Sequence, residues 1–571
     1  MRRFVSSLVV VGLVGVIGCT GTIGPGGDDT HGDDLPATVV FLTPTQHLSR
    51  ASLALRGVRP SIEDLKAVEA DPDALGGIVD RYLDSPEFGA TIKDLHNDTL
   101  LMRMEYQPLQ LPLTATFTNH TVVEINGSAY EEPLRLIEDI VMHDQPYTQI
   151  VTADYTLVDG IIAQIWGFPH SGPANVFTRY HWTDGRPSAG VLSTEVLYHR
   201  WISAGANYSR GRANLISRAF LCHDFLHSDI VVDTSIDLSD PEVVSNAVVA
   251  NPSCAGCHQT LDPLASYLMT FANHQPIAQL AQGQRDYPIG GYDPLGENRY
   301  RGTNHRPPMF FGVPATKLDG LGKAIADDPR FARCTAARFA SYLTEVPLDD
   351  VSGAWVARLQ KLFVENNFSA KKLARAVVLS DEFRVSHDTN PETADRLIGT
   401  QKLRPEQLSR MIRDLTGFRW TTPSGASIRS VPYGTGDLLD GDLVGFRVLF
   451  GGIDSYFVTE RVHTMNATSS LVAKAAASAA AEYIVEHDAV AAAADRKLFT
   501  AAAVGTTDET AVRAQIAYLH ARIFGDLVAA DSADVDQTYQ LFTAAAAAST
   551  PKRAWKIVLI AMLTDFRSLF Y

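Results

Sequence analysis

Two cysteines and a histidine form the pattern in this chain that is most specific for chemistry, Cys254-Ala255-Gly256-Cys257-His258. Thiols at this spacing can each add to a vinyl group of one haem from a single tight turn. The adjacent histidine can then place its imidazole against one face of the macrocycle and ligate iron. A thioredoxin-like pair would need a βαβ context and a zinc site a second Cys/His pair, and neither is evident. The spacing therefore predicts one covalent haem c per chain.

A haem ligated by His258 needs either a second axial ligand or an open face. Met309 is our candidate for the sixth ligand, because a methionine on a loop well after the motif often fills this role in small cytochromes. Two prolines precede Met309 and stiffen its approach, and its thioether would favour reduced iron. The alternative is that Met309 packs against the two phenylalanines that follow it. His274 and His305 are rival ligands.

Three further side chains of this region could bear on a metal. Met269 follows His258 on a predicted helix, where packing in the core is its expected role. His223 and His227 lie four positions apart and could share one helix face. Because no third ligand accompanies these two histidines, we expect them to be surface residues and not a metal site.

The N-terminus has the features of an export signal. Two arginines precede a mostly apolar run, and residues 1–18 are too few for a typical membrane span of about 20 residues. The run ends at Cys19 after a small residue, as in the processing site of a bacterial lipoprotein. We expect Cys19 to carry lipid that anchors the protein; an ordinary secretory peptide or an uncleaved anchor are the alternatives. Thr20, in place of the Asp of many inner-membrane lipoproteins, favours the outer membrane, on its periplasmic or cell-surface face.

Composition limits the partners of the exported chain. Glycine and aspartate dominate residues 19–45, which predicts a flexible tether between lipid and globular part. Loss of Arg2 and Arg3 on processing takes the formal net charge from −16 to −18. A chain this acidic should not bind nucleic acid through a general field.

Cysteine usage leaves one pair without an assigned role. Of five cysteines, Cys19 is the predicted lipid site, and Cys254 and Cys257 are the predicted haem anchors. In an oxidising compartment the remaining Cys222 and Cys334 are disulfide candidates. Two buried free thiols are the alternative, because a sequence does not show proximity.

Apolar periodicity predicts a mainly α, multi-domain protein. The predicted parts are an N-terminal helical domain (46–205), a cytochrome c-like helical haem domain (206–350) and a C-terminal helical domain (351–571). Within the haem domain, a helix at 209–227 and one at 333–343 are the candidates for crossing each other, and they carry Cys222 and Cys334. Residues 111–126 are β-like, and helical patterns resume at 133–142.

Short segments ending in an aromatic residue recur along the chain. Ser85-Pro86-Glu87-Phe88 has loose echoes that end at Phe331, Phe383 and Phe566. Each ends an apolar-periodic stretch, so the echoes indicate a recurring combination of a helix with an aromatic anchor and not a strict repeat; coincidence among many helices is the alternative.

Several signatures together resemble those of the planctomycete-type cytochrome c-like proteins, large exported multi-domain proteins that also occur in myxobacteria. The resemblance covers about residues 150–350 and is carried by 251–258, 261–264, 152–158, 190–192, 311–312, Leu318, 328–331 and Cys334. It implies c-type haem and electron transfer, and it supplies no substrate. Ala265, Met269 and Ala272 stand where the family has Gly, Glu and Asp, which puts in doubt any shared role of that acidic helix.

Three functions compete for these features. The leading prediction is a monohaem electron carrier with an unknown redox partner protein, since no acid–base apparatus stands out in the sequence. A haem-dependent oxidase or peroxidase remains open if Met309 leaves one haem face free. The third is a surface binding module with a structural haem, because the helical flanks are far larger than one haem needs.

Overall fold

The computed structural model describes residues 35–104, 122–166, 169–183, 185–194, 197, 201, 209–227, 233–270, 306–315, 317–391, 398–422, 427–428, 431–432, 436–441 and 445–571. Within these residues the protein is mainly helical, as the sequence predicted, and its strands form only two-stranded pairs. Cys19, His274 and His305 lie outside the described residues, as does the predicted signal peptide.

The chain up to residue 391 forms a first group of helices. These are α1 (Pro44–Arg56), α2 (Ile62–Ala70), α3 (Ala74–Leu83), α4 (Pro86–Leu100), α5 (Val122–Met142), α6 (Gly160–Trp166), α8 (Arg210–Leu221), α9 (Pro241–Ala250), α10 (Pro252–Ser266), α13 (Leu318–Asp327), α14 (Pro329–Thr344), α15 (Gly353–Glu365), α16 (Ala370–Val378) and α17 (Asp381–Arg384). Short 3-10 turns include η2 (Tyr147–Val151) and η3 (Gly190–Ser193).

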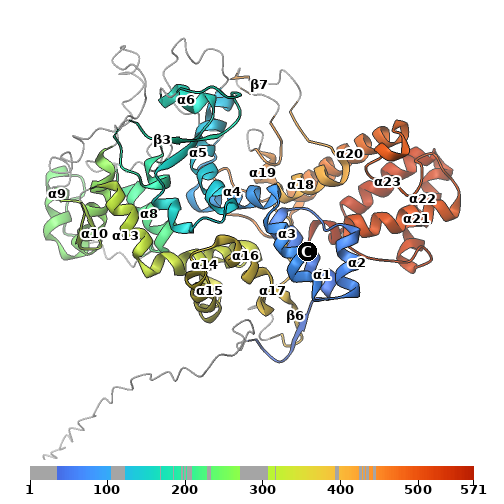
Figure 1. Ribbon diagram of the computed structural model, residues 1–571, viewed down its shortest axis with the longest axis horizontal. Helices are drawn as coiled ribbons and strands as arrows, with labels where there is room; N and C mark the ends of the chain where they lie inside the picture. Colours follow the sequence, from blue (N-terminus) through green and yellow to red (C-terminus); the bar gives the residue numbers. More distant parts are fainter. Residues whose placement is uncertain are drawn as a thin grey trace, which may run out of the picture.

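The rest of the chain forms a second group. Its elements are α18 (Pro405–Thr416), α19 (Phe446–Leu449), α20 (Ala467–Val490), α21 (Glu509–Leu519), the π-helical η9 (His520–Phe524), α22 (Ala533–Ala548), α23 (Pro551–Leu563) and α24 (Phe566–Leu569). Figure 1 shows α21, α22 and α23 at one end of the molecule and α9 and α10 at the other.

Four antiparallel pairs account for the described strands. They are β1 (Val39–Phe41) with β6 (Val385–Asp388), β2 (Tyr155–Val158) with β3 (Thr178–His181), β4 (Met309–Phe310) with β5 (Val313–Pro314), and β7 (Ser427–Ile428) with β8 (Val431–Pro432). The β1–β6 pair joins residues more than 300 apart in sequence, with Val40 opposite His387.

Two large hydrophobic cores lie under the two groups of helices, and Val158 and Ile162 form a separate small cluster. The first core runs from Leu48 in α1 to Ile398, and the second from Leu403 to Leu569, together with Leu53 of α1. The first core contains buried residues on both sides of each predicted domain boundary, near 205 and near 350. The division into three domains stays a prediction. None of the described helices combines the length and the apolar character that a membrane span requires.

The C-terminal residue lies where the two cores meet. Tyr571 and Gln401 exchange two backbone hydrogen bonds of 2.9 and 2.8 Å, and Tyr571 packs against both cores. Its hydroxyl also bonds the amide of Gln407 in α18 at 2.9 Å. Burial raises the pKa of Tyr571 to about 12, so the phenol stays neutral at physiological pH.

The folded part begins earlier than the predicted tether ends. β1 and the first two residues of α1, Pro44 and Thr45, lie within residues 19–45. Thr43 is the N-cap of α1 and forms a capping box with Gln46. Pro44 occupies the first helical position, where a backbone N–H would have no partner in the helix. The end of the predicted tether is therefore a strand and a helix start.

The β-like prediction for residues 111–126 is wrong where the structure tests it. Residues 105–121 lie outside the described part, and Val122 begins α5, which continues to Met142. Ile125, Ala129 and Tyr130 are buried at helical spacing, and this packing outweighs the strand preference of the valines. The predicted helix start at 133 is also wrong, since Pro133 lies inside α5.

The aromatic anchors recur at three of the four predicted places. Phe88, Phe331 and Phe383 are at most 1% exposed, and each lies in the first turns of a helix capped by Ser or Asp. Phe566 follows the same kind of cap at Asp565 but is 60% exposed. The predicted aromatic anchor is therefore buried in three of the four cases, and each segment also begins a new helix, which the echoes did not predict.

Two glycines allow the turn η2 to pack closely on its neighbours. A Cβ on Gly322 of α13 would overlap the carbonyl oxygen of Val151, and one on Gly190 would overlap that of Ile150. Gly190 also has φ +54°, which disfavours other residues. Any larger residue at either position would push η2 away from its neighbours in the first core.

Candidate functional site

The Cys-x-x-Cys-His pattern lies in the first turns of α10. Asn251 ends α9 and begins α10: its N–H donates to the carbonyl of Ala247 at 2.9 Å, and its side chain accepts from the N–H of Ser253 at 2.9 Å. The amide of Asn251 also donates to Asp233 at 2.8 Å. Pro252 follows at the first helical position, where proline suits the geometry. One residue thus sets the corner that presents the motif.

Both motif cysteines are thiols near one face of α10. Cys254 and Cys257 lie three positions apart, so they are neighbours on the helix surface, and each is half-buried and outside any disulfide. Cys257 packs against the edge of the first core. A Cβ added at Gly256, between them, would meet nothing within 4 Å. The helix therefore holds both half-buried thiols on one stretch of its surface.

His258 is oriented by a buried carboxylate one turn along the same helix. Its Nδ1 lies 3.2 Å from Oδ1 of Asp262, and the Asp262 side chain is 1% exposed. Arg210 of α8 donates to both oxygens of Asp262, from Nε at 2.5 Å and from Nη2 at 2.9 Å. Burial acts to raise the pKa of Asp262, but the bonds from His258 and Arg210 outweigh it, and the pKa is lowered.

This arrangement selects one tautomer of His258. An ionised Asp262 only accepts hydrogen bonds, so Nδ1 of His258 is the nitrogen that carries the proton. The Nε2 atom then keeps its lone pair, and no described residue forms a hydrogen bond with it. A carboxylate that holds Nδ1–H while Nε2 stays available is the usual support of a metal-binding histidine.

The segment before Met309 is fastened to the motif helix. Arg306 donates from Nη1 to the carbonyl oxygen of His258 at 3.1 Å, and its own carbonyl accepts from Ser266 at 2.9 Å. Three residues later β4 begins and packs against α10. Phe310 is buried in the first core, while Met309 is only half-buried and points to the other face of the strand. The structure thus brings the strand of Met309 to the motif helix.

Three other sequence candidates have clear surroundings. Met269 is 1% exposed, with Sδ 3.5 Å from the hydroxyl of Ser209, so its predicted role in the core is confirmed. His223 makes edge contacts with Phe225 and Phe311, at centroid distances of 4.6 and 5.7 Å. His227 is 84% exposed. In the part of the chain that the structure describes, no three His, Cys, Asp or Glu side chains converge as a metal-ion site.

The two remaining cysteines form a disulfide in the structure. Cys222 at the end of α8 is bonded to Cys334 in α14, with a Cα–Cα distance of 5.3 Å. Arg338 of α14 also donates to the last carbonyls of α8, those of Ala219 at 3.1 Å and Arg218 at 2.5 Å. These bonds satisfy acceptors that a helix C-terminus leaves open.

A series of contacts thus leads from the disulfide to the motif. The bond fixes α8 on α14, α8 carries Arg210, Arg210 holds Asp262, and Asp262 orients His258. The sequence pattern marked His258 but gave Arg210 no role and Asp262 only a place in the resemblance. The spacing of four between His258 and Asp262 was the available signal for Asp262; Arg210 lies 52 residues from Asp262 and left none.

Comparison of the chain with protein-family models, curated proteins and solved structures found no match.

Proposed function

We propose that this protein is an exported monohaem electron carrier, with haem bound covalently at Cys254 and Cys257 and His258 as the proximal ligand. The observation that carries the proposal is the orientation of His258: Asp262 holds Nδ1 at 3.2 Å and Nε2 has no partner among the described residues. A histidine that only packs in a core would be expected to have both nitrogens satisfied.

The thiols support the same proposal. They share one stretch of helix surface and stay out of the disulfide that the other two described cysteines form. A bound haem c supplies a one-electron iron couple. The chain's own residues would attach it through two thioether bonds, orient His258, and shield one edge with the first core.

Met309 is our proposed sixth ligand. The contact of β4 with α10 and the two bonds of Arg306 to α10 support it, since they keep this methionine near the motif. The helices α8, α10 and α14, with the disulfide between the first and the last, would form the cytochrome c-like haem domain. Lipid on Cys19 would anchor the protein to the outer membrane.

The test is an optical spectrum of the mature chain from a host that attaches c-type haem, with Cys19→Ser to keep it in solution. We expect one haem per chain by pyridine haemochrome, none in the Cys254→Ala/Cys257→Ala variant, and a thioether band that Met309→Ala removes. His258→Ala should lose low-spin ligation, whereas His227→Ala, at an exposed histidine, should not. Absence of haem from the wild-type chain would overturn the proposal. A high-spin haem that binds carbon monoxide would instead identify a haem enzyme.

A further inference from the structure

A charged cavity of about 300 Å³ is lined by residues that are distant in sequence from the motif helix α10. Residues of α4, α5 and α18 line it, and segments outside these helices contribute Arg103, Arg419, Asp437, Asp440 and Gly441. A volume of this size is at the lower end of what small-molecule sites show. Among its described lining residues are five basic side chains, Lys93, Arg103, Arg410, Arg413 and Arg419, and four acidic ones, Asp94, Glu131, Asp437 and Asp440.

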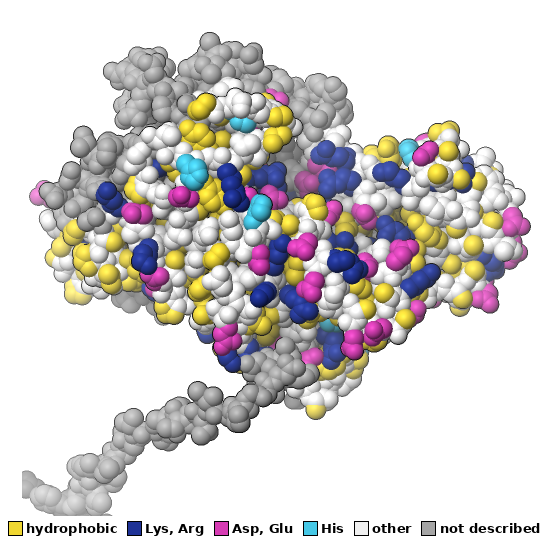
Figure 2. Space-filling model, in the orientation of Figure 1, with side chains coloured by type: hydrophobic (Ala, Val, Ile, Leu, Met, Phe, Trp, Pro, Cys, Tyr) yellow, Lys and Arg dark blue, Asp and Glu magenta, His cyan; other side chains and the backbone are white. Residues whose placement is uncertain are grey.

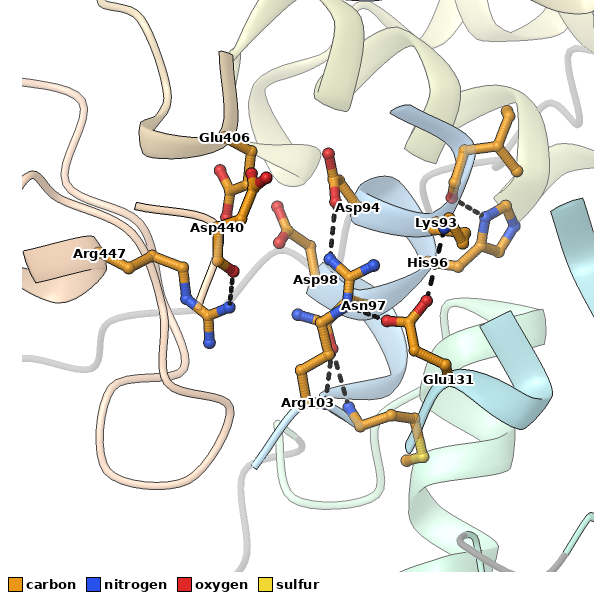
Figure 3. Close-up of polar contacts among 12 residues, drawn as sticks. Lys93, Asp94, His96, Asn97, Asp98, Arg103, Glu131, Glu406, Asp440 and Arg447 are labelled. Carbon is orange, nitrogen blue, oxygen red and sulfur yellow. Dashed lines mark hydrogen bonds and ion pairs between the residues drawn. The ribbon is translucent and has the colours of Figure 1, made fainter. Parts of the chain in front are cut away.

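On the α4 and α5 side of the cavity the charges are matched. Arg103 donates to Asp94 at 2.7 Å and to Glu131 at 2.5 Å, and Lys93 lies 3.5 Å from Glu131. Figure 3 shows Arg103 between these two acids. The pKa values of Asp94 and Glu131 are lowered despite burial, because the neighbouring cations outweigh it. This side is a closed ion-pair network.

On the α18 side the basic groups keep donors that no described residue accepts from. Arg410 is 5% exposed and donates from Nη2 to Asp94, while its Nη1 makes no hydrogen bond with a described residue. Arg413, one turn along α18, is exposed and has no ion pair within the described residues. Arg419 is 53% exposed, with Asp437 only at 4.0 Å. Figure 2 shows basic side chains gathered on this face near α18.

Asp437 does not neutralise these arginines fully. It accepts from the backbone N–H groups of Leu439 and Asp440 at 2.9 and 3.0 Å and from Ser409 at 3.0 Å, so its oxygens hold the loop together. The carboxylate of Asp440 forms no hydrogen bond with a described residue, although its backbone carbonyl accepts from Arg447. Guanidinium donors that face a polar cavity can bind carboxylate, sulfate or phosphate groups through charge-assisted hydrogen bonds.

We propose that this cavity binds a small oxyanion, with Arg410, Arg413 and Arg419 as its charge-assisted donors. The site lies between helices of the two cores, α4 and α5 on one side and α18 on the other. A bound anion would therefore bridge the two halves of the protein. This inference does not rest on the proposed haem function.

Asp440 adds a pH dependence to the site. Burial raises its pKa to about 7, and Asp437, Asp94 and Glu406 act in the same direction against Arg410. Asp440 lies with Glu406 across from the α4 acids Asp94 and Asp98 in Figure 3. Above that pKa the charged carboxylate repels an anion, and below it a neutral acid can donate a hydrogen bond to one. Anion binding should therefore strengthen as the pH falls.

Titration calorimetry on the mature chain at constant ionic strength tests the proposal, with sodium sulfate as the tetrahedral probe and sodium malonate as the carboxylate probe. We expect saturable binding of at least one probe, with a dissociation constant of about 1 mM or tighter. Arg413→Gln/Arg419→Gln should weaken it at least tenfold, roughly the worth of charge-assisted bonds. Arg553→Gln, at an exposed arginine of α23, should leave it unchanged.

The pH arm uses sulfate, which stays a dianion throughout. From about pH 8 to pH 6 its affinity should rise roughly fivefold in the wild-type chain and stay nearly constant in Asp440→Asn. Absence of saturable binding by both probes would overturn the proposal. So would equal binding by the Arg413→Gln/Arg419→Gln variant, or equal weakening by Arg553→Gln. Unchanged thermal melts of these surface variants ensure that a loss of binding is not a loss of folding.

Discussion

At His258 one ring nitrogen is committed to a carboxylate and the other is not. Asp262 accepts hydrogen bonds from two partners, His258 on its own helix and Arg210 on α8, and is itself almost fully buried. A buried carboxylate is tolerated in a protein only when such partners compensate its lost hydration. The stability of the folded protein should therefore depend on the residue that orients the proposed iron ligand.

Asp262→Asn should therefore lower the free energy of unfolding at pH 7 by about 2 kcal/mol. The lowered pKa of folded Asp262 fixes the sign of the pH dependence. Its stabilisation is present above the unfolded value near 3.9 and is lost as the pH falls through the folded pKa. Urea unfolding should show the difference between variant and wild type shrinking in acid. Asp154→Asn, whose carboxylate is 70% exposed, is the control and should show little difference at any pH.

Two buried histidines predict where the protein loses stability in acid. Burial lowers the pKa of His47 and of His96 to about 4, against hydrogen bonds to Val378 and Ile92 respectively. Between about pH 6.5 and 4 the two histidines are protonated in the unfolded chain but not in the folded chain. The free energy of unfolding therefore decreases as the pH is lowered through this range. At pH 5 each histidine should cost roughly 2 kcal/mol relative to pH 7.5.

Unfolding of His47→Gln and His96→Gln measures this effect. Each variant loses some stability at pH 7.5 but should show a flatter fall between pH 7.5 and pH 5 than the wild type. His143→Gln, at a histidine that is 61% exposed, should keep the wild-type slope. Parallel slopes for all four proteins would contradict the assignment of the acid sensitivity to these two sites.

At the scale of elements, the disulfide ties α8, the helix that carries Arg210, to α14. It closes a loop with a sequence separation of 112 residues. In the chain-entropy account a loop of that size restricts the unfolded chain by about 4–5 kcal/mol. Because α8 also packs on α10 and donates Arg210 to Asp262, the bond restrains a helix that supports the motif.

Cys222→Ser/Cys334→Ser should therefore lower the free energy of unfolding by about 3–5 kcal/mol in guanidinium titrations without reductant. A reducing agent should lower the stability of the wild-type chain to a similar level and leave the variant unaffected. With every chain prepared without haem, Cys254→Ser/Cys257→Ser replaces two cysteines that are outside the disulfide and is the matched control. Equal stability of both double variants would mean that the bond contributes nothing.

The sequence predicted elements best where local chemistry decides them. Ser61 and Ser85 are residue types that favour helix N-caps, and they cap α2 and α4; Gly417 ends α18 with φ 75°. It failed at α5, where Pro133 reads as a helix start and the valines before it read as strand. Only the first core, which buries Ile125 and its helical neighbours, decides that region, and this contact is not a local property of the chain.

At the scale of the whole molecule, the contacts that join the two cores left no sequence signal. Asp94 and Arg410, which meet at the cavity, are 316 residues apart. Neither belongs to a motif, and both look like ordinary surface charges in a helical pattern. The motif itself was predictable because its chemistry needs neighbours in sequence, whereas the cavity needs neighbours in space.

Arg461 offers the sharpest test of how the two cores are coupled. Its side chain is 9% exposed and lies between Asp98 of α4, at 2.7 Å, and Glu406 of α18, at 3.2 Å. Removing it leaves two carboxylates buried together without their cation. Breaking such a pair typically costs about 3–5 kcal/mol, most of which is the penalty of the uncompensated charge.

Arg461→Gln should accordingly lower the stability of the whole protein by about 3–5 kcal/mol and separate its unfolding into two steps. Fluorescence and circular dichroism followed in the same denaturant series would no longer coincide, because the first core contains Trp355 and the second Trp555. Lys552→Gln removes an exposed ion pair to Glu486 that joins two helices of the second group, α23 and α20. It should lower the free energy of unfolding by at most about 1 kcal/mol. If Arg461→Gln unfolded in one step with a cost as small as that of Lys552→Gln, the ion pairs would not be what couples the cores. The packing of Tyr571 against both would then have to do so.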